Sequence, residues 1–432
     1  MSFLLKINQQ LTLESGSKCV VNQFIGSGGQ GEVYEVIVDN ESYALKWYFN
    51  DQATKYQEEG IRALIKIGKP NDSFLWPINI ATSESSKSFG YIMELRQPEF
   101  KSLFDLMKNR ISPTFHTLAK ATYNLADSFR QLHSKGLCYR DISHGNIFFH
   151  PETGEILICD NDNVSVDNRE DESKTSGVVG TPRFMAPEIV RAEASPNANS
   201  DRFSLATLLF YMLFTSHPLE GENEANIRCF DQPAMDQIYG VKPIFIFDPI
   251  NTTNRPVHGY HDNAILYWGI YPDFLKDIFV KAFTEGLEAN KRVTETEWMN
   301  ALIQLKDSIF NCNCGAENFA NKEQKPLSCW NCSKIIQDTR LQFKRSFVSI
   351  NPNTKLYGHH LSHSTPYDLG EPQASIATHP NDPSILGLKN LGEHPWKAHS
   401  TANDMRAIDP QKSIVIKLGT TIDFGKVEAE II

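Results

Sequence analysis

The chain has 432 residues, of which 41% are apolar and 22% are charged, and its formal net charge is −10. This length exceeds the size at which single cores stop growing, so we expect two or three domains of ordinary globular composition. The negative charge argues against a nucleic acid or an anionic membrane as the main partner, since both require a positive surface. No run of about 18 apolar residues occurs and the first residues do not form a signal peptide, so we expect a soluble cytoplasmic protein.

The first fifty residues alternate short apolar runs with turns, which predicts strands. One turn contains the pattern G-x-G-x-x-G at Gly26, Gly28 and Gly31. A strand beginning at Val33 follows it, where a dinucleotide-binding fold would have a helix, and Lys46 comes fifteen residues after Gly31 in the next apolar strand. This order predicts a glycine-rich loop that covers phosphates and a lysine that reaches them. The alternative is a glycine-rich hairpin with an exposed lysine.

Residues 51–69 have apolar residues at helical spacing and predict a helix. The apolar run 89–95 then predicts a buried strand, and residues 102–108 and 114–135 predict two helices. The second of these helices leads directly into a polar loop at residues 139–146.

That loop contains Asp141, with Asn146 five positions later and Asp160 fourteen positions after that. Metal-assisted phosphoryl transfer needs these groups: a carboxylate to receive a hydroxyl proton, and an amide and a carboxylate to bind Mg²⁺. The residues that precede and follow them in order add weight to this interpretation.

Residues 139–146 and Asp160 resemble the H-R-D-x-x-x-x-N and D-F-G motifs of protein kinases, and residues 180–188 are similar to the A-P-E segment of Ser/Thr protein kinases. Asp201 occupies the position of the family's aspartate that binds the backbone of the catalytic loop. Arg292 occupies the position of the arginine that pairs with the A-P-E glutamate. The resemblance covers residues 15–308 and implies an α+β, bilobal protein-kinase fold.

The resemblance implies ATP and Mg²⁺ as cofactors and a protein as substrate. Asp141 would be the catalytic base, Lys46 would contact the α and β phosphates, and Asn146 and Asp160 would bind Mg²⁺. The implied nucleotide-binding residues are Ile25, Gly26, Ser27, Gly28, Gly29, Gln30, Gly31, Val33, Ala44, Lys46, Met93, Glu94, Arg96, Asn146 and Asp160. Arg140 would grip a phosphorylated activation loop, with Ser173, Thr175 and Ser176 as candidate phosphosites.

The chain departs from the family pattern at the helix acid that normally pairs with the lysine. Aligning the helix with the pattern places that acid at Gly60, directly after Glu58 and Glu59. Either Glu58 or Glu59 pairs with Lys46 through a shifted helix, or another acid takes this place.

Further departures lie in the catalytic segments. Tyr139 replaces a histidine, Ser143 replaces a lysine, and Asn161 and Asp162 replace the last two residues of D-F-G. Because the metal ligands are retained, we expect reduced or differently regulated turnover. A nucleotide-binding pseudokinase scaffold and a small-molecule kinase are the alternatives.

Residues 218–268 exceed what a minimal kinase lobe needs. They include an apolar run bounded by prolines, at 241–249, which either packs on the C-terminal lobe or forms a docking surface.

Eight cysteines occur in two groups. Cys19, Cys138, Cys159 and Cys229 are scattered and predict buried apolar positions. Cys312, Cys314, Cys329 and Cys332 form C-x-C and C-x-x-C pairs separated by fourteen residues, which predicts a structural zinc ribbon at residues 309–336. Two disulfides are the alternative.

Residues 337–432 contain short alternating runs separated by turn residues, which predict a small all-β sandwich. It faintly resembles forkhead-associated domains. Six histidines in this region raise the question of a second metal site, but their spacing favours surface or core positions; they are His359, His360, His363, His379, His394 and His399.

A kinase followed by a zinc ribbon and a β domain resembles bacterial kinases associated with von Willebrand factor A proteins and a metal-dependent phosphatase. The resemblance implies a Ser/Thr kinase of bacterial stress or tellurite-resistance signalling that phosphorylates a partner protein and itself.

Overall fold

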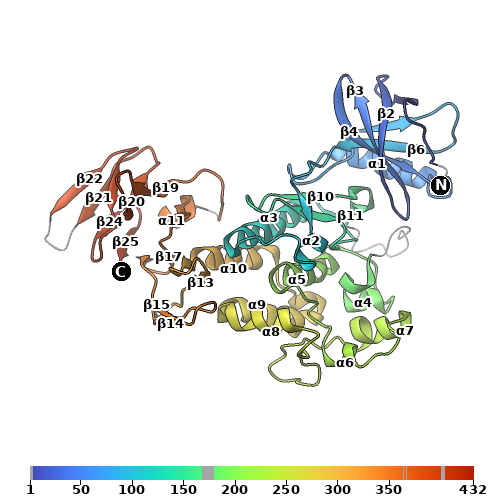
Figure 1. The fold of residues 1–432 in the computed structure, drawn as a ribbon. Helices are drawn as coiled ribbons and strands as arrows, with labels where there is room; N and C mark the ends of the chain where they lie inside the picture. Colours follow the sequence, from blue (N-terminus) through green and yellow to red (C-terminus); the bar gives the residue numbers. More distant parts are fainter. Residues whose placement is uncertain (1–2, 168–179, 363, 366, 400–403) are drawn as a thin grey trace. The chain divides into compact units, whose positions relative to one another are not determined.

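A computed structural model describes residues 3–167, 180–362, 364, 365, 367–399 and 404–432 (Figure 1). The chain divides into two compact units. The first comprises residues 1–113, 124–265 and 279–296, and the second comprises residues 114–123, 266–278 and 297–432. The domain boundaries at 308/309 and 336/337 stay predictions.

Six strands near the N-terminus form a closed antiparallel barrel in the order β1-β2-β3-β4-β6-β5 (blue in Figure 1). They are β1 (Gln10–Leu13), β2 (Lys18–Ser27), β3 (Gly31–Val38), β4 (Glu41–Tyr48), β5 (Asn79–Thr82) and β6 (Phe89–Glu94). Alternate side chains point inward, so Val21, Tyr34, Val36 and Leu45 are fully buried in its core. The glycine-rich turn joins β2 to β3.

Helix α1 (Lys55–Ile67) is shorter than predicted because Thr54 caps its N-terminus, accepting a hydrogen bond from the Gln57 backbone at 3.1 Å. At the other end Gly68 has a φ of 76°, a conformation that glycine adopts without strain. Ile61 and Leu64 are the buried residues of this helix.

Helices follow the barrel as far as residue 307, and in one of them, α5, nearly every residue is buried. They are α2 (Leu103–Met107), α3 (Phe115–Ser134), α4 (Pro187–Val190), α5 (Ala198–Phe214), α6 (Glu222–Ala225), α7 (Gln232–Met235), α8 (Asp262–Ile270), α9 (Asp273–Phe283) and α10 (Glu295–Asp307). Short strands and helical turns lie between them: β7 (Lys101–Ser102), β8 (Leu137–Cys138), β9 (Ile147–Phe149), β10 (Ile156–Ile158), η1 (Asn161–Asn163), β11 (Ser165–Val166), η3 (Pro182–Phe184), η4 (Asp236–Val241), η5 (Glu285–Leu287) and η6 (Ala289–Lys291).

The apolar run at 241–249 packs into this helical core. Phe245 is fully buried, with its ring 5.7 Å from Phe210 and 5.2 Å from Phe283. The prediction of an insertion packed on the lobe is therefore confirmed. The expectation of burial is wrong for one scattered cysteine, since Cys229 is exposed.

The C-terminal strands form two short hairpins and two larger sheets. The hairpins pair β12 (Ile309–Asn311) with β13 (Glu317–Phe319) and β14 (Leu327–Ser328) with β15 (Ile335–Ile336). One sheet has the order β17-β16-β25-β24-β21-β22 and the other β18-β19-β20-β23. These elements are β16 (Arg340–Phe343), β17 (Phe347–Ser349), β18 (Lys355–Leu356), α11 (Gly358–Leu361), β19 (Ala374–His379), β20 (Asp382–Asn390), β21 (Trp396–His399), β22 (Met405–Ile408), β23 (Ser413–Val415), β24 (Thr421–Asp423) and β25 (Glu428–Ile431). Leu341 and Ile422 of the first sheet share one core with Leu388 of the second, as in a β-sandwich.

Within the described ranges, no helix combines the length and the apolar character needed to cross a membrane.

Two glycines of the first unit should respond oppositely to substitution by alanine. At Gly31, a Cβ atom would lie 2.2 Å from the Trp47 carbonyl oxygen, so Gly31→Ala should lower the free energy of unfolding by about 1–3 kcal/mol. At Gly60, inside α1, a Cβ atom meets nothing within 4 Å, so Gly60→Ala should raise it by about 0.5–1 kcal/mol. Urea unfolding of both variants measures this, and equal effects of the same sign would contradict the packing described.

Candidate active site

The Lys46 side chain projects from β4 into a polar cluster beneath the glycine-rich loop. Its Nζ lies 2.8 Å from Asp162 Oδ2 and 3.4 Å from Asp160 Oδ1, and it donates to Gln30 Oε1 at 2.9 Å. The Lys46 side chain is only 6% exposed and that of Asp162 is fully buried. Burial alone lowers the pKa of Lys46, but the two carboxylates outweigh it and raise the pKa, so the ammonium stays charged.

The acid that pairs with Lys46 comes from the segment after β10, and not from helix α1. Asp162 also accepts a hydrogen bond from the Tyr48 hydroxyl. The helix supplies only a neutral group: Gln57 Nε2 donates to the Tyr48 hydroxyl at 3.1 Å and to the Asp162 carbonyl at 3.4 Å. Of the two options that the sequence left open, the substitution by another acid is the one observed.

The two helix glutamates bind other partners. Glu58 pairs with Arg62 at 2.6 Å, and Glu59 lies 3.6 Å from Lys55 on the exposed face. The alignment that placed the helix acid at Gly60 is wrong, since Gly60 is exposed. The helical period could have shown this, because residue 57 shares a face with Ile61 and Leu64 at spacings of four and seven.

A hairpin brings the two predicted magnesium ligands to neighbouring positions. In the pairing of β9 with β10, Ile147 lies opposite Ile158, so Asn146 precedes one strand and Asp160 follows the other. The Cys159 backbone N–H also donates to the Asn146 carbonyl at 2.8 Å.

Asp160 lies in a left-handed conformation (φ 50°), and its side chain is 43% exposed. Desolvation raises the pKa of the Asp160 carboxyl; Lys46 opposes this shift, and Asp162 adds to it. The next residue, Asn161, stands where the family motif has phenylalanine. It is fully buried and donates to the Leu75 and Ile158 carbonyls, both at 2.8 Å. Its amide therefore fixes the segment in place of an apolar ring.

The catalytic loop holds Asp141 close to Asn146. Asn146 Nδ2 donates to the Asp141 carbonyl at 2.9 Å and to its Oδ2 at 3.2 Å. The Thr181 hydroxyl donates to Asp141 Oδ1 at 2.8 Å. Both side-chain oxygens of Asp141 are thus oriented by neighbours.

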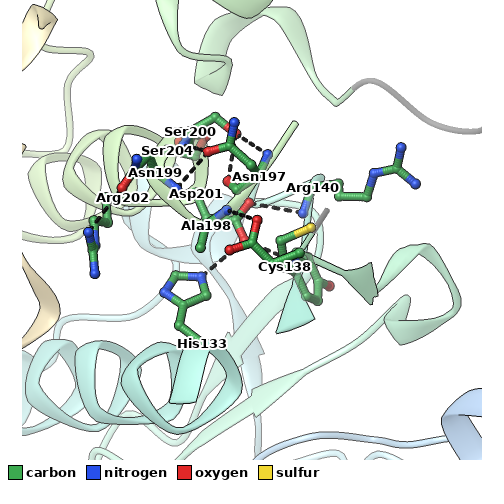
Figure 2. A network of polar contacts seen from close by, with 12 residues as sticks. His133, Cys138, Arg140, Asn197, Ala198, Asn199, Ser200, Asp201, Arg202 and Ser204 are labelled. Carbon is green, nitrogen blue, oxygen red and sulfur yellow. Dashed lines mark hydrogen bonds and ion pairs between the residues drawn. The ribbon is translucent and has the colours of Figure 1, made fainter. Parts of the chain in front are cut away.

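Asp201, in the first turn of α5, anchors the backbone of this loop (Figure 2). It accepts the Tyr139 N–H at 2.6 Å and the Arg140 N–H at 3.0 Å, where Arg140 has a φ of 76°. His133 links Asp201 (3.1 Å) to Glu295 (2.7 Å). Burial opposes protonation of His133, but its two carboxylate partners prevail and raise its pKa to about 9.

Apart from Asn146 and Asp160, the predicted nucleotide-binding residues lie on the barrel strands, on the glycine-rich turn or just after β6. Val33 is paired with Lys46, and Ala44 with Met93, which is buried. Gly26, Gly28 and Gly29 face open space, and Ile25 is exposed. Glu94, the last residue of β6, lies 3.2 Å from Lys69, and beyond this strand the Arg96 guanidinium carbon lies 4.3 Å from the centre of the Phe148 ring.

The A-P-E glutamate forms an ion pair with a buried arginine. Arg292 binds Glu188 Oε2 at 2.7 Å and donates to the Asn199 carbonyl at 2.9 Å. The candidate phosphosites Ser173, Thr175 and Ser176 lie outside the described residues.

The sequence was compared with models of known protein families. The protein kinase domain model matches residues 19–299, well over half of the chain. The chain belongs to the protein kinase family. This match confirms the prediction of a protein kinase. It also confirms that the kinase domain has mixed α and β content.

Individual kinases align with part of this kinase chain. Protein kinase YegI of Escherichia coli is 21% identical over 71% of the chain and 48% of its own length. Human protein kinase C delta type is 28% identical over 49% of the chain and 32% of its own length. Human serine/threonine-protein kinase H1 is 26% identical over 49% of the chain and 50% of its own length. The kinase chain thus spans half or less of the length of these relatives.

The kinase carries a second cluster, formed by the four C-terminal cysteines. Their sulfur atoms all lie within 4.8 Å of one another, with Cys312 to Cys332 at 3.6 Å and Cys314 to Cys329 at 3.8 Å. A disulfide would require about 2.05 Å. Four thiolates about 2.3 Å from a tetrahedral Zn²⁺ are about 3.8 Å apart, so the cluster fits this ion.

Asp307, His359 and His360 also come within 4.8 Å of one another, but hydrogen bonding argues against a metal there. Both imidazoles accept a backbone N–H at Nδ1, from Tyr357 at 2.8 Å and Asp368 at 3.4 Å, so each Nε2 carries the proton. His360 Nε2 then donates to Asp307 at 3.0 Å. The preference for core histidines over a metal site stays a prediction for this pair.

The raised pKa of His133 predicts a pH-dependent stability. The folded pKa of about 9 exceeds the unfolded value of about 6.5, so the stabilisation is complete below pH 6.5 and is lost as pH rises through 9. Between about pH 6 and pH 9.5, the free energy of unfolding should fall by roughly 3 kcal/mol more in the wild type than in His133→Asn. Denaturant unfolding across this range measures the difference, and parallel profiles would contradict the assigned charge.

Proposed function

We propose that this kinase transfers the γ-phosphoryl group of ATP to a Ser or Thr hydroxyl of a protein, with Mg²⁺. The observation that supports this proposal is the convergence of Lys46, Asp160 and Asp162 beside the hydrogen-bonded pair Asp141 and Asn146. An ammonium on one side and acids on the other can neutralise phosphates and hold their metal ion.

In this proposal Lys46 binds the α and β phosphates, below backbone amides of the glycine-rich loop. Asp160 and Asn146 hold Mg²⁺, which neutralises phosphate charge. The residues fit this ion in two respects. Two carboxylates share the single ammonium of Lys46, leaving a negative charge that a cation would balance. Within the described part of the chain no hydrogen bond occupies Asn146 Oδ1, since this side chain uses Nδ2 to bind Asp141.

Asp141 receives the proton of the substrate hydroxyl in this proposal. Its Oδ2 is held by Asn146 and its Oδ1 by Thr181, so the carboxylate is oriented before a substrate arrives. Oδ1 can exchange the Thr181 hydroxyl for the hydroxyl of a substrate. Hydroxyl groups of serine and threonine suit this contact.

The four cysteines bind a structural Zn²⁺ in the same proposal. With four thiolates the ion has no open position, so it stabilises the fold of the hairpins around it and takes no part in catalysis. Two amides support the sulfur atoms: Asn318 donates to Cys329 at 3.5 Å and Asn331 to Cys314 at 3.7 Å.

The finer assignments rest on the resemblance described from the sequence. They are a cytoplasmic role in bacterial stress signalling, autophosphorylation, and partnership with a von Willebrand factor A protein and a metal-dependent phosphatase. The β-sandwich and the cysteine module would recruit these partners. Co-purification of the full chain with each candidate tests them.

Radiolabelled ATP with Mg²⁺ tests the transferase activity. The wild type should label itself or a generic protein substrate, and Asp160→Ala and Asp141→Asn should each reduce the rate at least about 100-fold. Asp72→Asn serves as the control, since Asp72 is exposed and its ion pair among the described residues is with Lys69, at 2.8 Å. A wild type that binds ATP without any transfer would contradict the proposal and favour a pseudokinase scaffold.

Elemental analysis tests the cysteine site. Protein kept reduced should contain about one zinc per chain, and Cys314→Ser should lose most of it, whereas Cys229→Ser, at an exposed cysteine outside the cluster, should keep it. A wild type with well under one zinc per chain would argue against this site.

A further inference from the structure

The lysine of the site has an acid partner that comes from an unexpected part of the chain. We propose that Asp162 is the residue that positions Lys46 for phosphate binding, in place of an acid from helix α1. This inference rests on the proposed function and extends it to a residue with no assigned role.

The pairing of Asp162 with Lys46 is enforced by burial. The Asp162 side chain has no exposed surface, and its two oxygens lie 3.0 Å (Oδ1) and 2.8 Å (Oδ2) from Lys46 Nζ. A buried carboxylate requires a cation and hydrogen bonds to offset the loss of water, and here Lys46 and the Tyr48 hydroxyl provide them. Lys46 therefore cannot leave this position without stranding a buried charge.

The three partners of Lys46 differ in how easily they can be exchanged. Its ammonium has three hydrogens, and its partners are Asp162, Asp160 and Gln30. Gln30 is a neutral, half-buried group at the tip of a loop, and Asp160 is 43% exposed. Asp162 is thus the fixed partner, while the Gln30 contact is the one that a phosphate oxygen can replace.

Helix α1 makes no charged contact with this cluster. Gln57 reaches the Tyr48 hydroxyl and the Asp162 carbonyl, but it carries no charge. The fixed partner of Lys46 and the proposed metal ligand Asp160 therefore belong to the same three-residue segment, 160–162. It follows that the position of Lys46 depends on the segment 160–162 rather than on the position of α1.

A double-mutant cycle tests whether Asp162 acts through Lys46. Calorimetry on the full chain gives the affinities for Mg²⁺-ATP and for adenosine, which lacks phosphates. The isosteric Asp162→Asn should weaken ATP binding about tenfold and leave adenosine binding unchanged, and it should cause no further loss in Lys46→Ala. Glu59→Gln, which removes an exposed helix acid, is the control and should change neither affinity.

Equal losses for ATP and adenosine, or the same loss of ATP affinity with and without Lys46, would overturn the proposal and leave Asp162 a structural role. Melting temperatures within a few degrees of the wild type establish that Asp162→Asn folds.

A charge swap tests the equivalence with a helix acid. Asp162→Gly introduces the family residue and removes the partner of Lys46, and adding Gln57→Glu places a carboxylate on the helix face that already reaches Tyr48. The double variant should regain ATP affinity to within about threefold of the wild type. A double variant as weak as Asp162→Gly alone would overturn the equivalence.

These measurements do not depend on turnover. Binding results as expected in a protein that transfers no phosphate would refute the proposed activity and keep the role of Asp162. Normal transfer by Asp162→Asn with unchanged ATP affinity would refute the role of Asp162 and keep the activity.

Discussion

A buried ammonium shared by two carboxylates is the interaction on which the site depends. Removing one partner of a buried ion pair typically costs about 3–5 kcal/mol, because the other charge is left without water or a counterion. Lys46 on β4 and Asp162 after β10 are 116 residues apart, so this pair draws the barrel together with the segment that contains the proposed metal ligand Asp160. The same condition sets the conformation of the segment, since Asn161 and Asp162 are both buried and both hydrogen-bonded.

A second buried acid holds the catalytic loop. Asp201 binds two consecutive backbone N–H groups and a histidine whose charge is stabilised by Glu295. Arg140 adopts its left-handed conformation between these anchors, and Asp141 follows it directly. The proposed base and the proposed metal ligands are thus preorganised by buried charges in two segments that the hairpin β9–β10 joins, and helix α1 contributes only a neutral amide.

Much of the site could be predicted from the sequence, because motifs with fixed spacing leave few ways to assemble. Asp141 and Asn146 share one short loop, and a short hairpin brings Asp160 next to Asn146, as the spacing predicted. The cysteine spacing likewise predicted that four sulfur atoms would cluster. The residue of helix α1 that faces the site was not predicted. Gly60 was aligned by analogy, whereas burial of Ile61 and Leu64 turns residue 57 toward the site.

The sequence by itself determined which chemical groups are present and the order in which they occur, since these follow from residue type and short-range spacing. It also determined the strands of the barrel and the sandwich, through alternation of apolar residues. Only the tertiary structure decided which acid pairs with Lys46. Glu58, Glu59 and Asp162 are all carboxylates, and burial selects among them: the two glutamates lie on the outer side of a helix, where water and basic neighbours satisfy them, whereas Asp162 is fully enclosed and can be satisfied only by a cation that is enclosed with it.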